Sequence, residues 1–499
     1  MTKLWHHLPE AQLAARPDAP ALSDTTGADW TWADLDAAIA DLERHLKDAG
    51  VVRGDRVLML VENCAAAIAG FFACSRLGAT VIPFNARQTA AEVDRVMQHA
   101  TPAAILMTSE VSSDAAAHAA RMGATSIAGR FGTLDIVTCA SDPEGDGDVA
   151  VVLYTTGTTG DPKGVMLTHG NLVFGGTASA QLREMSSDDV IYGVLPISHV
   201  FGLASVVTAA ALTGASIRFE PRFLAERLYD ALTSGVTLLS AVPQMHALLM
   251  QYTREQGFDR LPSETLRYVS SGAAPLDPTW KRQAEAFYGV ALQNGYGMTE
   301  TTAGVSITQS KLGDPDISTG PPLPGVEVHI DETVPGGGEG AGEVLVRGPH
   351  VMKGYFRNHD ETAKALSDEG WLRTGDLGKL DGAGRLHILG RSKELIIHGG
   401  FNVYPPEVEA ALNDHPQVVQ AAVIGRMVGG DEKVMAFCQV PEGCDLTEDA
   451  LRAFVAERLA GYKRPSRIIL ASSLPAAPTG KILKHKLLDA FSDQLDQTN

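Results

Sequence analysis

The sequence feature that most constrains the fold is an alternation of helical and short apolar segments between residues 31 and 108. Thr31 and Asp34 match a helix capping box, and Gly50 follows the helix that they would begin. Short apolar strands that alternate with helices favour a parallel sheet with helices on both faces. We predict helices over residues 31–47, 65–77 and 93–99, and strands over residues 57–61, 80–84 and 103–108.

The chain is too long for one hydrophobic core, because its 499 residues exceed the roughly 250–300 at which a single core stops growing. The pattern changes to strands and Gly-rich turns near residue 325, and to a small mixture of helices and strands after Gly390. We predict a large α/β N-terminal domain over residues 1–390, with mixed, mostly parallel sheets, flanking helices and a small β-barrel-like part. A small α+β C-terminal domain is expected over residues 391–499. The expected elements after residue 325 are strands at 326–330, 342–347, 385–389, 418–424 and 433–440, a hairpin turn at 335–339, helices at 405–412 and 447–459, and a last helix after Lys481.

Charge and cysteine content exclude several classes of protein. The net charge of −19 makes nucleic acid and anionic membrane poor partners. The five cysteines are scattered without C-x₂-C spacing, which disfavours disulfides and a zinc site. No signal-peptide profile and no run of about 18 apolar residues is present, so we expect a cytoplasmic protein without a membrane span. A homodimer is compatible with the sequence, because a dimer interface and a core use the same apolar residues.

Residues 154–164, Tyr-Thr-Thr-Gly-Thr-Thr-Gly-Asp-Pro-Lys-Gly, form a segment that we call the Thr/Gly loop. It is not a Walker A loop, because Pro162 precedes Lys163 and no hydroxyl follows it. Its glycines expose backbone N–H groups to an anion, and its lysine adds a positive charge. Apolar strands at 151–154 and 165–168 flank the loop, which places it where open α/β sheets bind ligands. The predicted phosphate-binding residues are Thr155, Thr156, Gly157, Thr158, Thr159, Gly160 and Lys163.

Six further motifs accompany the loop, and together they resemble the adenylate-forming superfamily, in particular its AMP-forming acyl-CoA synthetases. The resemblance spans essentially the whole chain and keeps the family's motif order. It implies that ATP activates a carboxylate as acyl-AMP with release of pyrophosphate, and that the thiol of coenzyme A then forms acyl-CoA. ATP, Mg²⁺ and coenzyme A are the ligands it implies. The further motifs are Pro196–His199, Ser271–Pro275, Asn294–Glu300, Thr374–Asp376, Gly390–Glu394 and Pro478–Lys481.

The nucleotide contacts follow from the resemblance, residue by residue. It assigns Mg²⁺ to Glu300 with help from Thr155, and a lone carboxylate among small residues suits a magnesium ion that keeps most of its waters. Tyr296 is expected to face the adenine and Thr299 the α-phosphate. Asp376, read as part of a turn, and Arg391 are expected to bind the ribose hydroxyls. Gly272, Ala273, Ala274, Asn294, Gly295 and Gly297 complete the nucleotide-binding set that the resemblance implies.

The resemblance also implies that the small domain moves between two states. Lys481 would enter the active site during adenylate formation, where it neutralises charge on the substrate carboxylate and the α-phosphate. Lys393 falls at the family's hinge, and Gly399 and Gly400 would line the tunnel for the pantetheine arm of coenzyme A. His199 is expected to control access between the acyl pocket and that tunnel rather than to act as a general base.

The acyl substrate is predicted as a medium-chain or aromatic monocarboxylate. The expected pocket positions are small or apolar, and His246 is a further candidate that would allow a polar aryl group. An amino acid is disfavoured, because residues 199–205 carry no acid to pair with an α-amino group. Two alternatives stay open: an acyl-AMP ligase or adenylation enzyme that loads a carrier protein, although residues 374–400 lack the insertion of such ligases, and a non-catalytic nucleotide-binding relative. The pocket positions are Phe201, Gly272, Gly297, Ala303 and Gly304.

Overall fold

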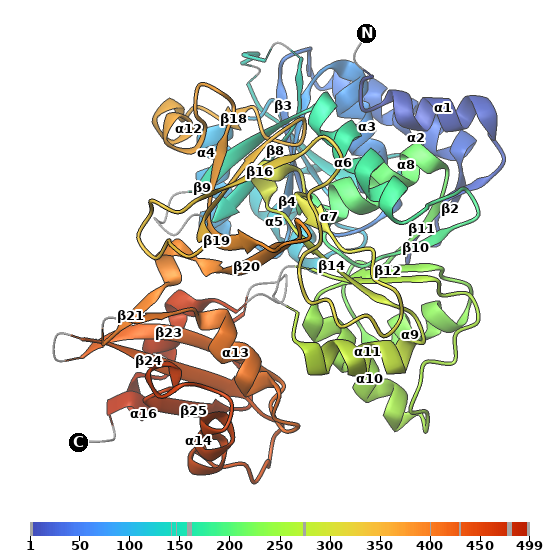
Figure 1. Cartoon of the computed structure of the whole chain (residues 1–499). Helices are drawn as coiled ribbons and strands as arrows, with labels where there is room; N and C mark the ends of the chain where they lie inside the picture. The colour runs from blue at the N-terminus through green and yellow to red at the C-terminus, as the bar shows by residue number, and fades with distance from the viewer. Residues whose placement is uncertain are drawn as a thin grey trace.

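A computed structural model describes residues 3–140, 142–145, 147–156, 162–272, 276–399, 401–428, 431–476 and 482–496. The chain forms a large N-terminal domain and a smaller C-terminal domain, which contains the last strands and helices (Figure 1). This arrangement agrees with the predicted fold class.

One eight-stranded sheet carries the Thr/Gly loop at the end of a central strand. In spatial order it contains β18 (Gly354–Tyr355), β9 (Pro162–Thr168), β8 (Val149–Thr156), β4 (Thr80–Asn85), β3 (Arg56–Val61), β5 (Ala104–Met107), β7 (Gly132–Thr138) and β6 (Thr125–Gly129). Strands β8, β4, β3 and β5 run parallel. Strand β9 returns antiparallel beside β8 and β18 pairs antiparallel with β9. The Thr/Gly loop therefore connects the two strands of a hairpin, and it follows the carboxyl end of a parallel strand, as predicted.

The second eight-stranded sheet supplies most of the remaining motif positions. It contains β15 (Ser306–Ile307), β14 (Leu292–Tyr296), β13 (Tyr268–Ser271), β12 (Leu238–Ala241), β10 (Val190–Gly193), β11 (Ser216–Phe219), β1 (Pro20–Ser23) and β2 (Asp29–Thr31). Strands β14, β13, β12, β10, β11 and β1 are parallel, and the edge strands β15 and β2 are antiparallel.

The helices and the two eight-stranded sheets form five layers, in the order helix, sheet, helix, sheet, helix. Helices α4 (Ala90–Ala100) and α5 (Ser113–Met122) pack on the outer face of the first sheet, and α9 (Ala225–Thr233), α10 (Pro243–Glu255) and α11 (Pro278–Tyr288) on that of the second. The inner layer shares one buried cluster with both sheets; it consists of α1 (His7–Ala15), α2 (Trp32–Asp48), α3 (Ala65–Leu77), α6 (His169–Leu182), α7 (Val200–Gly202), the π-helix η1 (Leu203–Thr208) and α8 (Ala209–Thr213).

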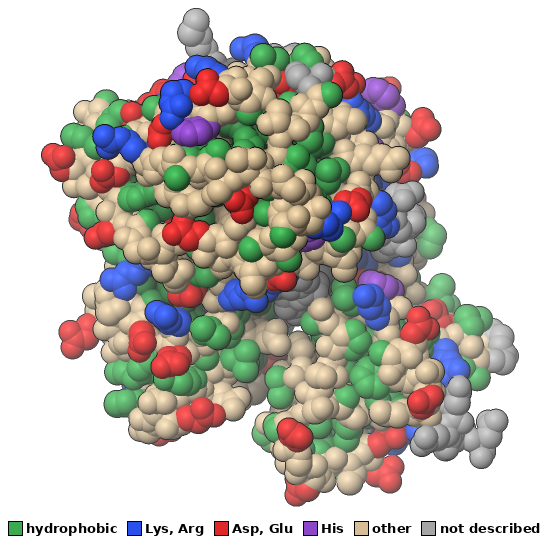
Figure 2. Space-filling view, turned by 180° about the vertical axis from the view of Figure 1, so that it is seen from behind, with side chains coloured by type: hydrophobic (Ala, Val, Ile, Leu, Met, Phe, Trp, Pro, Cys, Tyr) green, Lys and Arg blue, Asp and Glu red, His purple; other side chains and the backbone are tan. Residues whose placement is uncertain are grey.

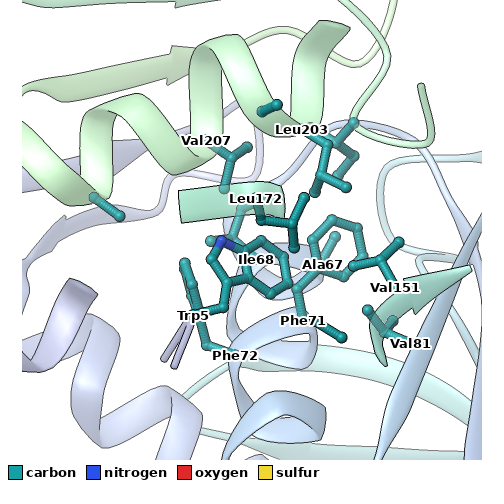
Figure 3. Packing of buried hydrophobic residues seen from close by; sticks show 14 of the residues in the cluster. Trp5, Ala67, Ile68, Phe71, Phe72, Val81, Val151, Leu172, Leu203 and Val207 are labelled. Carbon is teal, nitrogen blue, oxygen red and sulfur yellow. The ribbon is translucent and has the colours of Figure 1, made fainter. Parts of the chain in front are cut away.

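The inner layer packs around an aromatic centre. The Trp5 ring lies 4.8 Å from the Phe72 ring, and its indole N–H donates to the Thr208 hydroxyl over 2.9 Å. Figure 3 shows side chains of α3, α6, η1 and the strands β4 and β8 meeting there. Strand β3 is buried on both faces, with Met59 in this cluster and Leu58 in the outer one, as the period of a strand requires.

Three local predictions in this domain are confirmed. The Thr31 hydroxyl accepts from the Asp34 backbone N–H and the Asp34 carboxylate accepts from the Thr31 N–H, which completes the capping box of α2. The predicted helix 65–77 agrees with α3, and residues 335–339 lie in the turn between two antiparallel strands.

A four-stranded antiparallel sheet stands where the β-barrel-like part was expected. It contains β16 (Glu327–Asp331), β17 (Ala341–Arg347), β19 (Leu372–Leu380) and β20 (Leu386–Arg391). The interpretation of Asp376 as a turn residue is wrong, because it lies within β19. Gly375 has a left-handed backbone (φ +71°) and the pairing of β17 with β19 shifts register nearby, so an irregular strand resembles a turn in sequence. Two short elements lie nearby in the chain: the 3₁₀ turn η2 (Thr299–Thr301) precedes the sheet, and α12 (His359–Ala365) lies between β17 and β19.

The small domain is an α+β unit with its own core. Its elements are η3 (Ser392–Glu394), β21 (Ile396–His398), β22 (Phe401–Val403), α13 (Pro405–Asn413), β23 (Gln420–Val428), β24 (Asp431–Gln439), α14 (Glu448–Ala456), η4 (Gly461–Lys463), β25 (Arg467–Ala471), η5 (Lys484–Lys486), α15 (Leu487–Ala490) and α16 (Ser492–Asp496). Val408, Val423 and Leu451 are among its buried residues. The last helix that we predicted is divided into three short helical pieces.

Two features concern the surface of the molecule. Seen from behind, a hollow separates the part that contains α9–α11 from the small domain (Figure 2). Among the described residues, no helix is both long enough and apolar enough to cross a membrane.

Candidate functional site

The motif residues gather where parallel strands end. Strand β14 leads into Gly297 and the turn η2, β13 leads into Gly272, and β10 leads into the segment that ends at His199. The carboxyl ends of parallel strands share one edge of a sheet, which is where open α/β sheets bind ligands. The first sheet reaches the same place, because Tyr355 of its edge strand β18 contacts Glu300 of η2.

Three residues from separate motifs form one connected polar group. The Tyr296 hydroxyl donates to Asp376 Oδ2 over 2.6 Å, and Arg391 Nε lies 3.2 Å from Asp376 Oδ1. Asp376 and Arg391 are register partners on β19 and β20. Burial, followed by the neighbouring Asp376 charge, raises the pKa of Tyr296 well above its usual value, so the phenol keeps its proton. The buried carboxylate is thus held between a neutral donor and a cation.

Glu300 offers a buried carboxylate that fits a metal ion. Its side chain is buried, and the Tyr355 hydroxyl donates to its Oε1 over 2.9 Å. Burial raises the pKa of Glu300, which identifies a carboxylate whose charge has little compensation inside the protein. A hard divalent cation supplies that compensation, and carboxylate oxygen is the ligand that Mg²⁺ prefers.

Lys163 is the described cation of the Thr/Gly loop, and it contacts two residues that lie far along the chain. It forms an ion pair with Glu361 of α12. Its Nζ also lies 5.2 Å from the centre of the Tyr355 ring, within cation–π distance. Thr155 is the register partner of Lys163 across the β8–β9 hairpin. The loop lysine, the Tyr355 ring and the Glu300 carboxylate therefore lie in one connected group.

Close backbone packing explains two glycines of the site. A Cβ at Gly297 would lie 2.0 Å from the carbonyl oxygen of Ala303, so a side chain there requires backbone movement. A Cβ at Gly272 would lie 2.9 Å from the Phe201 ring, which places that ring directly against the Gly272 backbone. Gly272, Phe201, Gly297 and Ala303 therefore form two close pairs, both of them at predicted pocket positions.

The two histidines singled out from the sequence differ in environment. His199 caps α7, and its Nδ1 accepts from the Phe201 backbone N–H over 3.2 Å. His246 is fully buried; its Nδ1 lies 2.7 Å from the Tyr288 hydroxyl and its Nε2 lies 3.3 Å from the Ser270 carbonyl oxygen. The hypothesis that His246 reaches the pocket is therefore wrong, because both ring nitrogens are engaged in the core.

Other predicted residues are placed as follows. Asn294 is buried in β14, where its amide N–H donates to the Ser318 carbonyl over 3.1 Å, and Thr299 begins η2. Lys393 lies in η3, between the last strand of the four-stranded sheet and the first strand of the small domain. Gly399 has a left-handed backbone (φ +58°). Gly295 and Thr156 lie in β14 and β8. Gly157, Thr158, Thr159, Gly160, Ala273, Ala274, Gly400 and Lys481 lie outside the described residues.

Sequence reasoning missed Tyr355 and Glu361. Tyr355 follows a Gly in a segment that carries no catalytic motif. Glu361 is an ordinary acid in the first turn of α12, where such residues commonly offset the helix dipole. It lies 198 positions from Lys163, so no local pattern could connect the two.

Comparisons with known proteins show the family to which the chain belongs. The family model of AMP-binding enzyme matches residues 9–356, and that of AMP-binding enzyme C-terminal domain matches residues 407–481. Feruloyl-CoA synthase from Amycolatopsis sp is 34% identical over 472 residues, covering 93% of this chain and 94% of that protein. The 4-coumarate–CoA ligase 3 of Oryza sativa subsp. japonica is 32% identical over 508 residues, covering 96% and 90%.

A solved structure extends the likeness to three dimensions. The o-succinylbenzoate coenzyme A synthetase of Bacillus subtilis, in complex with ATP and magnesium ion, matches with a TM-score of 0.80 at 28% identity. The match covers 96% of this chain and 98% of that one. ATP and Mg²⁺ are therefore the ligands of a structural relative.

Proposed function

Because this chain belongs to the AMP-binding enzyme family and is an AMP-forming carboxylate–CoA ligase, we propose that its substrate is an aromatic monocarboxylate and that the residues described above hold ATP. The ATP-dependent formation of acyl-CoA is common to its relatives. The acid, the residue roles and the movement of the small domain are the parts that we add.

The nucleotide is proposed to lie along the carboxyl edge of the second sheet. Asp376 can accept from both ribose hydroxyls if the diol replaces the Tyr296 donor, and Arg391 fixes its second oxygen. Tyr296 presents its ring to the adenine, and Thr299 presents its hydroxyl to the α-phosphate. The β- and γ-phosphates extend to the Thr/Gly loop, where Lys163 supplies positive charge.

The chemistry proceeds in two steps. A carboxylate oxygen of the acid attacks the α-phosphorus, the bond to the bridging oxygen breaks, and pyrophosphate leaves. The sulfur of coenzyme A then attacks the acyl carbon, and AMP leaves. Magnesium, held by Glu300 and Thr155, would neutralise the phosphate oxygens when bound. Lys163 and Lys481 also neutralise negative charge. Lys163 acts on the leaving pyrophosphate, and Lys481 acts at the reacting α-phosphate and carboxylate.

The small domain is proposed to begin after Gly390 and to change its orientation between the steps. Lys393 lies in a short 3₁₀ element between two sheets, a position that can absorb a backbone rotation. In the second orientation, Gly399 and Gly400 would line the passage for the pantetheine arm, and His199 would separate that passage from the acyl pocket.

The absence of charge at the five proposed pocket positions is the observation that carries the substrate proposal. Phe201 lies against Gly272, and Gly297 packs on Ala303, so the proposed pocket offers a flat aromatic wall and small neighbours. None of its five positions carries a charge that would pair with a second carboxylate. The relatives named after ferulate and 4-coumarate support an aromatic acid, whose ring would stack on Phe201.

A substrate panel tests this proposal. Pyrophosphate release and acyl-CoA formation would be measured with acetate, octanoate, benzoate and cinnamate. We expect the highest kcat/KM with an aromatic acid and at least a tenfold preference over octanoate. A preference for octanoate, or turnover of acetate alone, would contradict the aromatic assignment. Phe201→Ala should reduce kcat/KM for cinnamate more than for acetate, since acetate does not reach the ring.

A further inference from the structure

The contact between the Thr/Gly loop and helix α12 has no counterpart in the proposed chemistry. Lys163, proposed to bind the leaving phosphates, is paired with Glu361 of α12. The Lys163 ammonium group thus has two competing anionic partners: the Glu361 carboxylate and, by the proposed function, the triphosphate of ATP. From this competition we infer that Glu361 is a positioning residue. It holds Lys163 in the nucleotide-free enzyme and competes with ATP for this lysine. The inference rests on the proposed phosphate-binding role of Lys163.

The backbone places Glu361 next to the loop independently of the ion pair. Strand β18 pairs with β9, with Tyr355 opposite Val165, and the Phe356 N–H donates to the Gly164 carbonyl over 2.7 Å. The chain then turns into α12, where the Asn358 side chain caps the Glu361 N–H over 3.1 Å. Glu361 is therefore held near the loop end of the hairpin by strand pairing and by the Asn358 cap.

The resting place of Lys163 lies close to the proposed metal site. Its Nζ lies over the ring of Tyr355, and the hydroxyl of that ring donates to Glu300. A triphosphate that reaches the Glu300 metal therefore passes close to the Lys163–Glu361 pair. The carboxylate of Glu361 opposes the incoming phosphates by its charge and withholds the lysine that would bind them.

Glu361 has a second partner that remains when Lys163 leaves. One carboxylate oxygen contacts Lys163, and the other accepts from Lys364 Nζ over 2.7 Å. The two lysines hold the pKa of Glu361 down to about 2, so the carboxylate stays ionised at any working pH. Protonation of Glu361 therefore does not release Lys163, and when a competing anion binds the lysine, Lys364 still neutralises the carboxylate that is left behind.

The expected change in ATP affinity follows from the solvent exposure of the Lys163–Glu361 pair. The side chains of Lys163 and Glu361 are 23% and 30% exposed, which makes the pair a surface ion pair with modest energy. Pairs of this kind correspond to a change of about two- to fivefold in an equilibrium constant. Glu361→Gln should therefore lower the Kd of ATP by about two- to fivefold. It should leave the Kd of AMP unchanged, because AMP lacks the phosphates that reach the loop.

The test measures ATP and AMP binding to the full chain by isothermal titration calorimetry in the presence of Mg²⁺. Asp360→Asn is the matched control, because it makes the same change of charge one residue earlier in α12 and, among the described residues, no ion pair joins Asp360 to Lys163. The gain in ATP affinity should diminish as KCl is raised, because salt screens exposed charges. Equal ATP affinity of Glu361→Gln and Asp360→Asn, weaker ATP binding by Glu361→Gln, or the same shift for AMP would each overturn the inference.

A double-mutant comparison separates this inference from the proposed function. In a Lys163→Met background, Glu361→Gln should have no effect on ATP affinity, because the competed group is gone. If Lys163→Met binds ATP as well as the wild type does, the phosphate role of Lys163 itself is wrong. If Lys163→Met weakens ATP binding while Glu361→Gln alone changes nothing, only the role of Glu361 is wrong.

Discussion

Replacement of Gly297 by alanine tests the geometry of the site most directly. The added Cβ would lie 2.0 Å from the Ala303 carbonyl oxygen, whereas Cβ contacts under 3.0 Å essentially do not occur. The Ala303 carbonyl is a backbone group and a Cβ is fixed to its own backbone, so relief requires a backbone movement of about 1 Å. Glu300 lies three residues further on, and its carboxylate moves with this turn. Because a misplacement of about 1 Å commonly costs 10²-fold in rate, Gly297→Ala should reduce kcat about 100-fold.

The assay for this prediction is ATP–pyrophosphate exchange with the best acid of the substrate panel. Gly382→Ala is the matched control, since a Cβ there meets nothing within 4 Å and the Gly382 backbone has no positive φ. Thermal unfolding should show a loss of about 1–3 kcal/mol in the Gly297 variant, the usual cost of forcing atoms into a packed site. Exchange within threefold of the wild-type rate, in a variant that remains folded, would refute the argument that this close contact positions Glu300.

Three further predictions address the proposed roles. Lys481→Ala should abolish adenylate formation but leave thioester formation from supplied acyl-AMP largely intact, and exchange above about a tenth of wild type would contradict its role. Lys393→Pro should still form acyl-AMP but no acyl-CoA. Normal acyl-CoA formation by this variant would show that the hinge does not lie at Lys393. Glu300→Gln should lose Mg²⁺-dependent activity at least about 100-fold. Without nucleotide at pH 7, its melting temperature should be no lower than that of the wild type. Burial raises the Glu300 pKa above 4.5, so the folded chain binds this proton more tightly than the unfolded chain, and wild-type stability falls relative to the variant as the pH rises past 4.5. Lower stability of Glu300→Gln than of the wild type at pH 7 would refute the argument that the ionised Glu300 carboxylate destabilises the folded chain.

Local patterns predicted the elements well, because the forces involved act over a few residues. The capping box of Thr31 and Asp34 depends only on residues three apart, and the helix at 65–77 follows from a run of small and apolar residues between Cys64 and Gly78. The strand that contains Asp376 was missed, because the left-handed Gly375 interrupts it and looks like a turn. His246 was misplaced for a related reason, since a partner such as Tyr288 on another element leaves no signal near the histidine.

The sequence by itself determined the alternating architecture, the order of the motifs and the residue types at the proposed nucleotide site, because these depend on residue identity and short spacings. The connections between motifs were decided only by tertiary structure. Asp376 meets Tyr296 across 80 positions, and Lys163 meets Glu361 across 198. Such pairs arise because strand pairing and the packing of separate sheets and helices bring distant segments together, and no property of either residue alone records that. The sequence thus predicted a phosphate-binding role for Lys163, and only the fold brought Glu361 into contact with that lysine.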